Sequence, residues 1–156
     1  MRGVSVKWPN DLVVGQAKLA GILVELGGEF LGPCHALIGV GLNVHLPAAA
    51  HAAIGQPATD LGTLCDGKPP GRSRLASALV EHVGEALDVF AAQGFAAFAG
   101  EYARHDALRG RALRIDDPRG AFEGEGRGVD ARGALRVRTR TGERTVDSAE
   151  VSIRRA

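Results

Sequence analysis

Apolar residues in the first 46 positions come in short runs separated by glycine-rich turns. The runs "VSVKW" and "LVV" are brief, whereas residues 18–26 and 36–44 are apolar almost throughout. Short runs rich in Val, Ile and Leu between turn signals are typical of β-strands, and continuous ones are typical of strands covered on both faces. This part of the chain therefore predicts a β-sheet.

A helix is predicted between Ser73, which can cap its N-terminus, and Gly94, which ends it. Between them, apolar side chains recur three or four positions apart, which places them on one face of a helix. These side chains are Leu75, Leu79, Val83, Leu87 and Phe90. A second short helix is predicted over residues 95–104, and both helices are expected to cover the sheet. Residues 47–71 are a connection, with a short helix near 60–64.

After Arg109 the pattern changes to short segments, several of which alternate apolar with polar residues. The turn signals "DPRG", "ARG" and "TG" separate these segments. Short strands at a spacing of about ten residues predict a small five-stranded barrel. We place the boundary between residues 105 and 109, which gives one domain over residues 1–106 and a second over 107–156.

Composition excludes several classes of protein. The chain has 156 residues, 45% of them apolar, and a net charge of +1, which does not suggest disorder or a membrane span. It begins without a cleavable signal sequence, and its two cysteines have no CxxC spacing, so we expect a cytoplasmic protein with reduced thiols. A zinc site from Cys34, His35 and Cys65 lacks a fourth ligand at a fitting spacing.

Polar residues interrupt the apolar strands at three places. Lys18 opens a long strand; its ammonium either reaches water from the strand end or binds a carboxylate or phosphate. Asn10 and Asp11 either form a plain Asx turn or face a ligand. Residues 39–43, "GVGLN", fail as a dinucleotide fingerprint because the third glycine and the following helix are absent. As a strand end with two glycines, they permit close contact with a flat ligand.

The order of three segments decides between these interpretations. "KWPNDL", then "KLAGILVEL", then "GVGLNV", with these gaps, resembles the central part of biotin protein ligases, which adenylate biotin and attach it to a carrier-protein lysine. The resemblance continues through the helix after Ser73 and through a C-terminal barrel that ends in "AEVSIR". It implies an α+β fold: part of a mixed β-sheet of the class II synthetase type, covered by helices and followed by an SH3-like barrel.

The resemblance also implies a role for each matched residue. Lys18 would meet the biotin carboxylate and then the phosphate of the adenylate, where a fixed ammonium stabilises transition-state charge. Asp11 would position the incoming carrier lysine and take its proton. Together with Lys18, the residues implied to bind biotin are Gly21, Ile22, Leu23, Gly39 and Gly41. The residues implied to bind the nucleotide are Asn10, Asn43 and Arg154.

The substrates implied are biotin and ATP, with Mg²⁺ entering with ATP near Asn43 and no direct protein metal site. The implied partner is a biotin carboxyl carrier protein of acetyl-CoA carboxylase, and a homodimer through an open sheet edge stays open. No membrane partner is expected. Nucleic acid is not expected either, because residues 104–156 hold 13 Arg against 9 Asp or Glu, a net of +4, and Phe122 is their sole aromatic residue.

The chain departs from the family pattern at its start. In that family a glycine- and arginine-rich loop precedes "KWPND", whereas the nearest equivalent here, "GRSR" at residues 71–74, opens a helix. We therefore expect the C-terminal half of a ligase. Alone, it should neither adenylate biotin efficiently nor retain the intermediate, because an adenylate exposed to water would leak or hydrolyse. The alternative is a non-catalytic fragment that binds biotin or the adenylate and dimerises or complements a separate N-terminal half.

Overall fold

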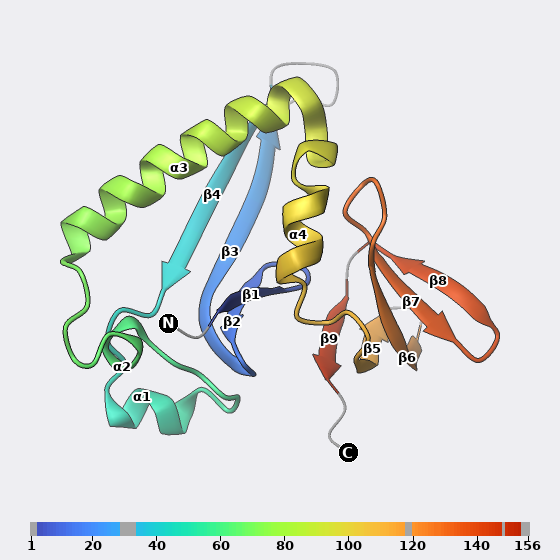
Figure 1. The fold of residues 1–156 in the computed structure, drawn as a ribbon, viewed down its shortest axis with the longest axis horizontal. Coiled ribbons are helices and arrows are strands. Elements are labelled where there is room, and N and C mark those ends of the chain that lie inside the picture. The colour runs from blue at the N-terminus through green and yellow to red at the C-terminus, as the bar shows by residue number, and fades with distance from the viewer. Residues whose placement is uncertain (1–2, 29–33, 118–119, 148, 154–156) are drawn as a thin grey trace. The chain divides into compact units, whose positions relative to one another are not determined.

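The computed structural model describes residues 3–28, 34–117, 120–147 and 149–153 (Figure 1). Two β-sheets and several helices make up these residues. The predicted α+β class is therefore confirmed. Within the described part of the chain, no helix combines the length and the apolar character that a membrane crossing requires.

The chain divides into two compact units. The first consists of the chain up to Ser5 together with Asn10–Pro69, and the second of Val6–Pro9 together with the chain from Pro70 onward. A short stretch near the N-terminus thus belongs to the C-terminal unit. The predicted domain boundary between residues 106 and 107 lies inside the second unit and stays a prediction.

The first sheet has the strand order β1-β2-β3-β4. Its strands are β1 (Val4–Lys7), β2 (Asp11–Val14), β3 (Ala17–Gly28) and β4 (Cys34–Leu42). The strands predicted over 18–26 and 36–44 are confirmed as β3 and β4. β2 pairs with β3 and β3 with β4, both antiparallel, so these pairings are antiparallel where the resemblance implied a mixed sheet. A two-residue hairpin joins β2 to β3, and its first residue, Gly15, has a φ of 64°, which favours glycine.

Two short helices follow β4 in the first unit. They are α1 (Ala48–Ala53) and α2 (Leu61–Leu64). The helix predicted near residues 60–64 is confirmed as α2, and the Asp60 carboxylate caps it by accepting from the Thr63 N–H at 2.7 Å. The alanine-rich α1 was not predicted, because its sequence carries neither a side-chain cap nor an apolar period.

The second unit begins with three helical segments. They are α3 (Arg72–Gln93), the 3₁₀ turn η1 (Gly94–Ala97) and α4 (Ala99–His105). Both predicted helices are confirmed, and Gly94 ends α3 with a φ of 64°. The cap assigned to Ser73 is wrong, because α3 starts one residue earlier, after Gly71, without a side-chain cap. The covering of the first sheet by these helices stays a prediction.

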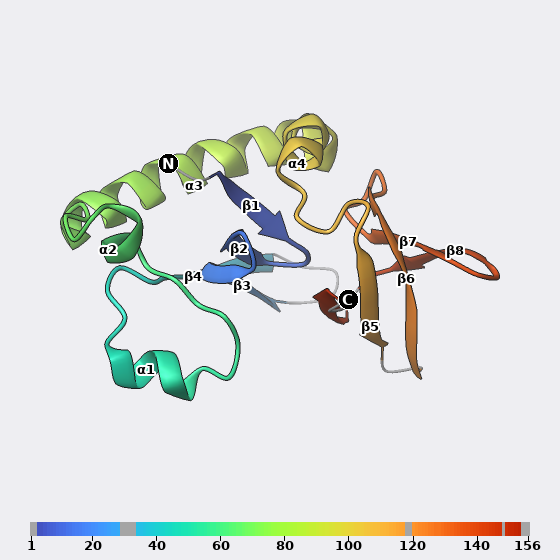
Figure 2. The ribbon, with the colours of Figure 1, turned by 60° about the horizontal axis from the view of Figure 1, so that its bottom comes forward.

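The second sheet contains the five strands predicted after Arg109, in the order β8-β7-β6-β5-β9 (Figures 1 and 2). They are β5 (Ala112–Asp117), β6 (Gly120–Val129), β7 (Leu135–Thr139), β8 (Gly142–Val146) and β9 (Glu150–Ile153). Every neighbouring pair is antiparallel. Alternating side chains of these strands form a buried core, as expected for a small barrel-like domain.

Trp8 completes the core of this second sheet from near the N-terminus. Its ring is only 5% exposed and belongs to the same buried cluster as Leu113, Ile115 and Val137. The indole Nε1 donates to the Gly133 carbonyl at 3.0 Å, across 125 positions of sequence. The tryptophan of the "KWPND" segment is thus a barrel core residue, a role that the sequence did not predict.

Candidate functional site

The centre of the predicted site is an ion pair between β2 and β3. The Lys18 Nζ lies 2.5 Å from Oδ1 of Asp11, and the two side chains are 33% and 16% exposed. The two residues predicted to carry the chemistry therefore lie in direct contact. Without a ligand, the carboxylate of Asp11 neutralises the ammonium of Lys18. An anionic ligand would share this ammonium with Asp11 or displace the carboxylate.

A β-bulge in β3 turns Lys18 toward Asp11. On a regular strand, Lys18 and the residue three positions on would point to opposite faces of the sheet. Here Leu12 lies opposite Ala20, but the next residue, Val13, lies opposite Lys18, so Leu19 is an extra residue in β3. Bulges of this kind re-aim a neighbouring side chain. The bulge thus accounts for the orientation of Lys18, and no sequence pattern signalled it.

Glycines line the sheet beside this ion pair. Gly21 lies opposite Asp11 on β2 and opposite Gly41 on β4, so three strands contribute to one row. Leu23 and Gly39 form the next row on the same side, because side chains two apart on a strand share a face. We call the surface formed by Asp11, Gly21, Leu23, Gly39 and Gly41 the glycine face.

The missing side chains leave room on this face. A Cβ built at Gly21 would lie 3.2 Å from Nζ of Lys18 and 3.4 Å from Oδ1 of Asp11, so glycine lets the ion pair rest against the strand. At Gly41 a Cβ would meet, among the described residues, only the Gly21 carbonyl oxygen, at 3.8 Å. The face is therefore a flat backbone floor that a ring system can approach closely.

Ile22 does not share this face. Its side chain points to the opposite side of the sheet from those of its two neighbours, because side chains alternate along a strand. Its main chain instead holds Asn10: the Ile22 N–H donates to the Asn10 carbonyl at 2.9 Å, and the Asn10 side-chain amide donates to the Ile22 carbonyl at 2.7 Å. The structure thus places Asn10 beside the glycine face and gives Ile22 a backbone role there.

Asn43 is held by the main chain around Lys18. Its side-chain amide donates to the carbonyls of Lys18 at 3.2 Å and Thr59 at 3.1 Å. Its own backbone N–H donates to the Leu19 carbonyl at 3.0 Å. Both amide protons are therefore engaged, and Oδ1 is the side-chain atom that remains to accept from a nucleotide.

Sequence reasoning missed the segment that holds the Lys18 main chain. The Lys18 N–H donates to the Pro57 carbonyl, and the Thr59 N–H donates to the Lys18 carbonyl, both at 2.9 Å. Next to Thr59, the buried Asp60 carboxylate accepts from the Leu46 N–H at 2.6 Å as well as from the Thr63 N–H of α2. These backbone hydrogen bonds lower the pKa of Asp60. The sequence signal was limited to the helix-capping aspartate.

The sequence predictions for Arg154 and for a metal site receive no test. Arg154 lies outside the described residues, so its assignment to the nucleotide stays a prediction. Among the described residues, no group of three His, Cys, Asp or Glu side chains is placed to hold a metal ion, and Cys65 is a free, half-buried thiol.

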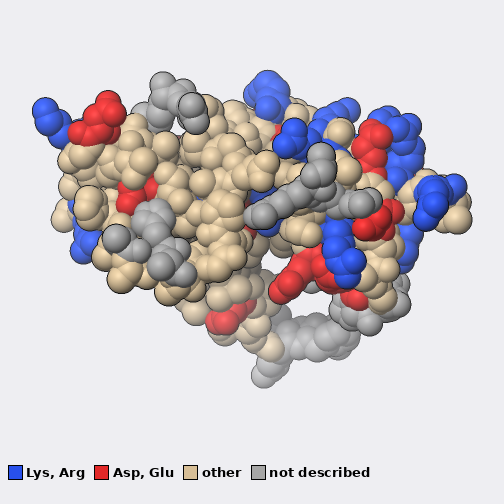
Figure 3. Space-filling model, turned by 90° about the horizontal axis from the view of Figure 1, so that it is seen from below, with Lys and Arg blue, Asp and Glu red and all other residues tan. Residues whose placement is uncertain are grey.

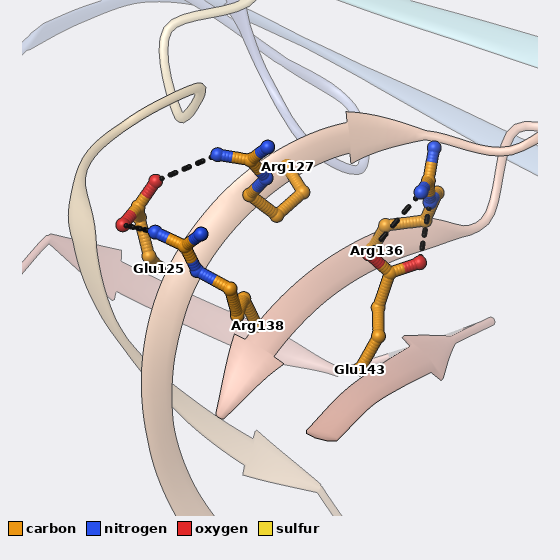
Figure 4. Close-up of polar contacts among 5 residues, drawn as sticks. All are labelled: Glu125, Arg127, Arg136, Arg138 and Glu143. Carbon is orange, nitrogen blue, oxygen red and sulfur yellow. Dashed lines mark hydrogen bonds and ion pairs between the residues drawn. The ribbon is translucent and has the colours of Figure 1, made fainter. Parts of the chain in front are cut away.

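Ion pairs occupy many of the arginines of the second sheet (Figure 4). Glu125 accepts from Arg138 at 2.7 Å and from Arg127 at 3.1 Å, and Arg136 makes two hydrogen bonds to Glu143. The hydrogen bonds from Arg138 and Arg127 hold the pKa of Glu125 below its usual range. Basic and acidic side chains are interspersed on the face drawn in Figure 3. This pairing favours a solvated, mixed-charge surface over a nucleic-acid interface.

Two family models match the chain. The model for the Biotin/lipoate A/B protein ligase family covers residues 2–43, and the model for the Biotin protein ligase C terminal domain covers residues 105–154. The first match contains the ion pair, the glycine face and Asn43.

Known proteins also match over most of the chain. The bifunctional ligase/repressor BirA of Escherichia coli is 33% identical over 132 residues, which are 85% of this chain and 40% of that protein. The biotin–[acetyl-CoA-carboxylase] ligase of Paracoccus denitrificans is 30% identical over 158 residues, or 95% of this chain and 62% of the relative. The structure of the biotin protein ligase of Aquifex aeolicus in complex with biotin and ATP matches 98% of this chain and 62% of that one, with 26% identity and a TM-score of 0.80.

The chain therefore spans between two fifths and two thirds of the length of these relatives. The two family models match its two ends, and the structural match runs through the segment between them. On this evidence the chain belongs to the biotin protein ligase family.

Proposed function

We propose that this chain supplies the biotin and adenylate site of a biotin–protein ligase. Such an enzyme forms biotinyl-5′-AMP from biotin and ATP and then transfers biotin to a carrier-protein lysine. The observation that carries the proposal is the partly buried Lys18 ammonium, held beside a backbone floor of glycines. The relative from Paracoccus is named as such a ligase, and the Aquifex structure contains biotin and ATP.

In the first half-reaction, a biotin carboxylate oxygen attacks the α-phosphorus of ATP, and pyrophosphate leaves. Both reactants are anions, and negative charge accumulates on the oxygens of the α-phosphate in the transition state. The Lys18 ammonium stabilises that charge most where it develops, which accelerates the reaction rather than only tightening binding. The bulge at Leu19 turns the Lys18 side chain toward the glycine face, and the lack of a side chain at Gly21 leaves room for its ammonium to contact a ligand there.

In the second half-reaction, the carrier lysine amine attacks the acyl carbon of biotinyl-5′-AMP, and AMP leaves. The attacking amine must first lose a proton, because a free lysine has a pKa of about 10.4. Asp11 is the carboxylate of the glycine face and accepts that proton once the adenylate has engaged Lys18.

The Asp11→Asn variant tests this role. We expect transfer from preformed biotinyl-5′-AMP to slow by about a hundredfold, because an amide cannot take the proton. Binding of the adenylate should stay equal or become tighter, since the neutral amide no longer competes for the Lys18 ammonium. Single-turnover transfer to a biotin carrier domain measures the rate, and Asp116→Asn on β5 is the control. Wild-type transfer by Asp11→Asn would discard the proton-acceptor role.

The Gly41→Val variant tests the glycine face. Among the described residues, a Cβ at position 41 would meet only the Gly21 carbonyl oxygen, and valine is favoured in strands, so the free energy of unfolding should not fall. The same side chain would occupy the ligand's space, and we expect affinity for a non-hydrolysable sulfamoyl analogue of biotinyl-adenylate to drop about tenfold or more. Titration calorimetry measures the affinity, with Gly3→Val as the control, because no atom of the described residues lies within 4 Å of a Cβ there. Unchanged affinity in Gly41→Val would show that biotin lies elsewhere.

The nucleotide side of the site is proposed from Asn10, Oδ1 of Asn43 and Arg154. Mg²⁺ would enter with ATP, since it takes most of its ligands from phosphates and water and needs no protein cage. Oδ1 of Asn43 is the acceptor that we place nearest to this ion.

The carrier partner is proposed to be the biotin carboxyl carrier protein of acetyl-CoA carboxylase, by analogy with the name of the Paracoccus relative. The two cysteines in 156 residues support a reducing, cytoplasmic setting. A homodimer through the edge of the first sheet is part of the same proposal.

Biotin-dependent exchange of pyrophosphate into ATP tests the function as a whole. The chain is assayed alone and with an added N-terminal half of a biotin protein ligase, because it spans only part of its relatives. We expect exchange in the complemented sample. Binding of the sulfamoyl analogue without exchange in either sample would favour the non-catalytic fragment instead. The absence of both binding and exchange would contradict the proposal.

A further inference from the structure

We propose that Asp60 is a positioning residue for Lys18, and that it acts through the backbone of residues 57–59. The inference rests on the proposed function of Lys18, and Asp60 is not expected to touch either substrate. All of the contacts that carry it lie within the first unit.

Lys18 lies in the part of β3 that does not pair with β4. β4 ends at Leu42, which lies opposite Ala20, so the residues of β3 before Ala20 have no partner in β4. Residues 57–59 take that place: Ala58 forms a parallel bridge with Lys18, and the flanking peptide groups exchange two hydrogen bonds of 2.9 Å with the Lys18 main chain. The backbone at the bulge, from which the ammonium projects, is thus held by this short segment.

The short segment is fixed in turn by Asp60. The carboxylate is 3% exposed and accepts two backbone N–H groups, from Leu46 at 2.6 Å and Thr63 at 2.7 Å. Leu46 lies in the chain that follows β4, and Thr63 lies in the first turn of α2. The Asp60 side chain thus connects both segments to its own backbone, which directly follows Thr59. Hydrogen bonds from two N–H groups to a charged acceptor are stronger than those to a neutral one.

The chemistry at position 60 requires two acceptor atoms. An asparagine offers one carbonyl oxygen and turns an NH₂ group toward the second backbone N–H, where two donors would face each other. Residues 57–59 should then shift relative to β3, and the ammonium with them. Misplacement of a reacting group by about 1 Å can cost about a hundredfold in rate.

The test compares Asp60→Asn with Asp130→Asn. Asp130 is the control in the second unit. Its Oδ1 alone accepts two backbone N–H groups, from Arg132 at 2.8 Å and Ala134 at 3.0 Å, whereas Asp60 uses both of its carboxylate oxygens. Asp60→Asn should lower the melting temperature more than Asp130→Asn, because an asparagine at position 130 can turn its one carbonyl oxygen to both donors. Only Asp60→Asn should weaken binding of the sulfamoyl analogue of biotinyl-adenylate, by about tenfold, measured by calorimetry well below both melting temperatures.

A double-mutant cycle with Lys18→Ala separates positioning from general stability. If Asp60 acts through the ammonium, Asp60→Asn should weaken binding in the wild-type background and have little further effect on the Lys18→Ala variant. Equal losses in both backgrounds, or wild-type affinity in Asp60→Asn, would overturn the inference while leaving the function of Lys18 intact. Failure of the wild-type chain to bind the analogue would instead overturn the proposed function and the inference with it.

Discussion

Replacing Lys18 with alanine should slow biotin-dependent pyrophosphate exchange by about a hundred- to thousandfold. The exchange is measured with an added N-terminal half of a biotin protein ligase. The size follows from the loss of one preorganised charged contact to the transition state, which typically costs on the order of 3–4 kcal/mol. The described structure supports an effect of this size, because the Lys18 side chain is only 33% exposed and its Cε and Nζ occupy the space beside Gly21 that a Cβ would crowd. A freely hydrated surface lysine would contribute far less.

Lys68→Ala is the control for this prediction. The chain has three lysines, at positions 7, 18 and 68, and Lys68 lies exposed after α2. Its removal changes the net charge by the same amount and should leave exchange unchanged. Lys18→Arg should not restore full activity, because the broader, planar guanidinium cannot take the place of the compact ammonium beside Gly21 and Asp11. Equal exchange by wild type and Lys18→Ala would remove this lysine from the mechanism.

Replacing Trp8 with alanine should destabilise the second sheet by about 3–5 kcal/mol, the usual loss for a large aromatic residue removed from a core. The ring contributes to the same buried cluster as Leu108, Leu113 and Val137, each of which is fully buried. The change also removes the donor to the Gly133 carbonyl. Trp8→Phe should lie between wild type and Trp8→Ala, because it keeps most of the ring contact and loses the hydrogen bond.

Hydrogen exchange is the appropriate measurement for Trp8→Ala, since a chain of two compact units need not unfold in one step. Amides of β5 and β7 should lose protection, whereas those at the centre of β3 should change little. Phe90→Ala on α3 is the control, because that ring is 52% exposed and its removal should cost little. Full protection of β5 and β7 in Trp8→Ala would show that the barrel does not depend on the N-terminal segment.

Local patterns were sufficient for most of the fold. The runs at 18–26 and 36–44, the period that ends at Gly94, and the turns after Arg109 each signal an element from neighbouring residues, and each element is present. The exception at Ser73 is also local: the observed cap, Gly71, lies two positions earlier, which makes Ser73 a first-turn residue, and composition does not separate the two roles.

The parts of the site that depend on register could not be predicted. The sequence identified Lys18 and Asp11 as polar residues in apolar strands but not their contact, which depends on an extra residue at Leu19. Alternation along β3 likewise removes Ile22 from the glycine face, although it lies between two residues that belong there. Both the contact between Lys18 and Asp11 and the orientation of Ile22 depend on pairing between strands, which the sequence alone does not fix.

The same limit applies to residues that act at a distance in sequence. In the sequence, Trp8 belongs to the "KWPND" segment, next to the predicted site residues Asn10 and Asp11. Only the fold shows that its ring lies in a core built from residues from Leu108 onward. Asp60 belongs to a connection, and its hydrogen bond to Leu46 exists only because the chain turns back after β4.

Whether Lys18 contacts the acyl phosphate can be settled by a crystal structure of the chain with the sulfamoyl analogue bound. We expect the analogue to lie over Gly21 and Gly41, with Nζ of Lys18 within about 3.2 Å of an oxygen of the group that replaces the acyl phosphate. A structure in which Lys18 still contacts only Asp11, while the analogue lies away from these glycines, would contradict it.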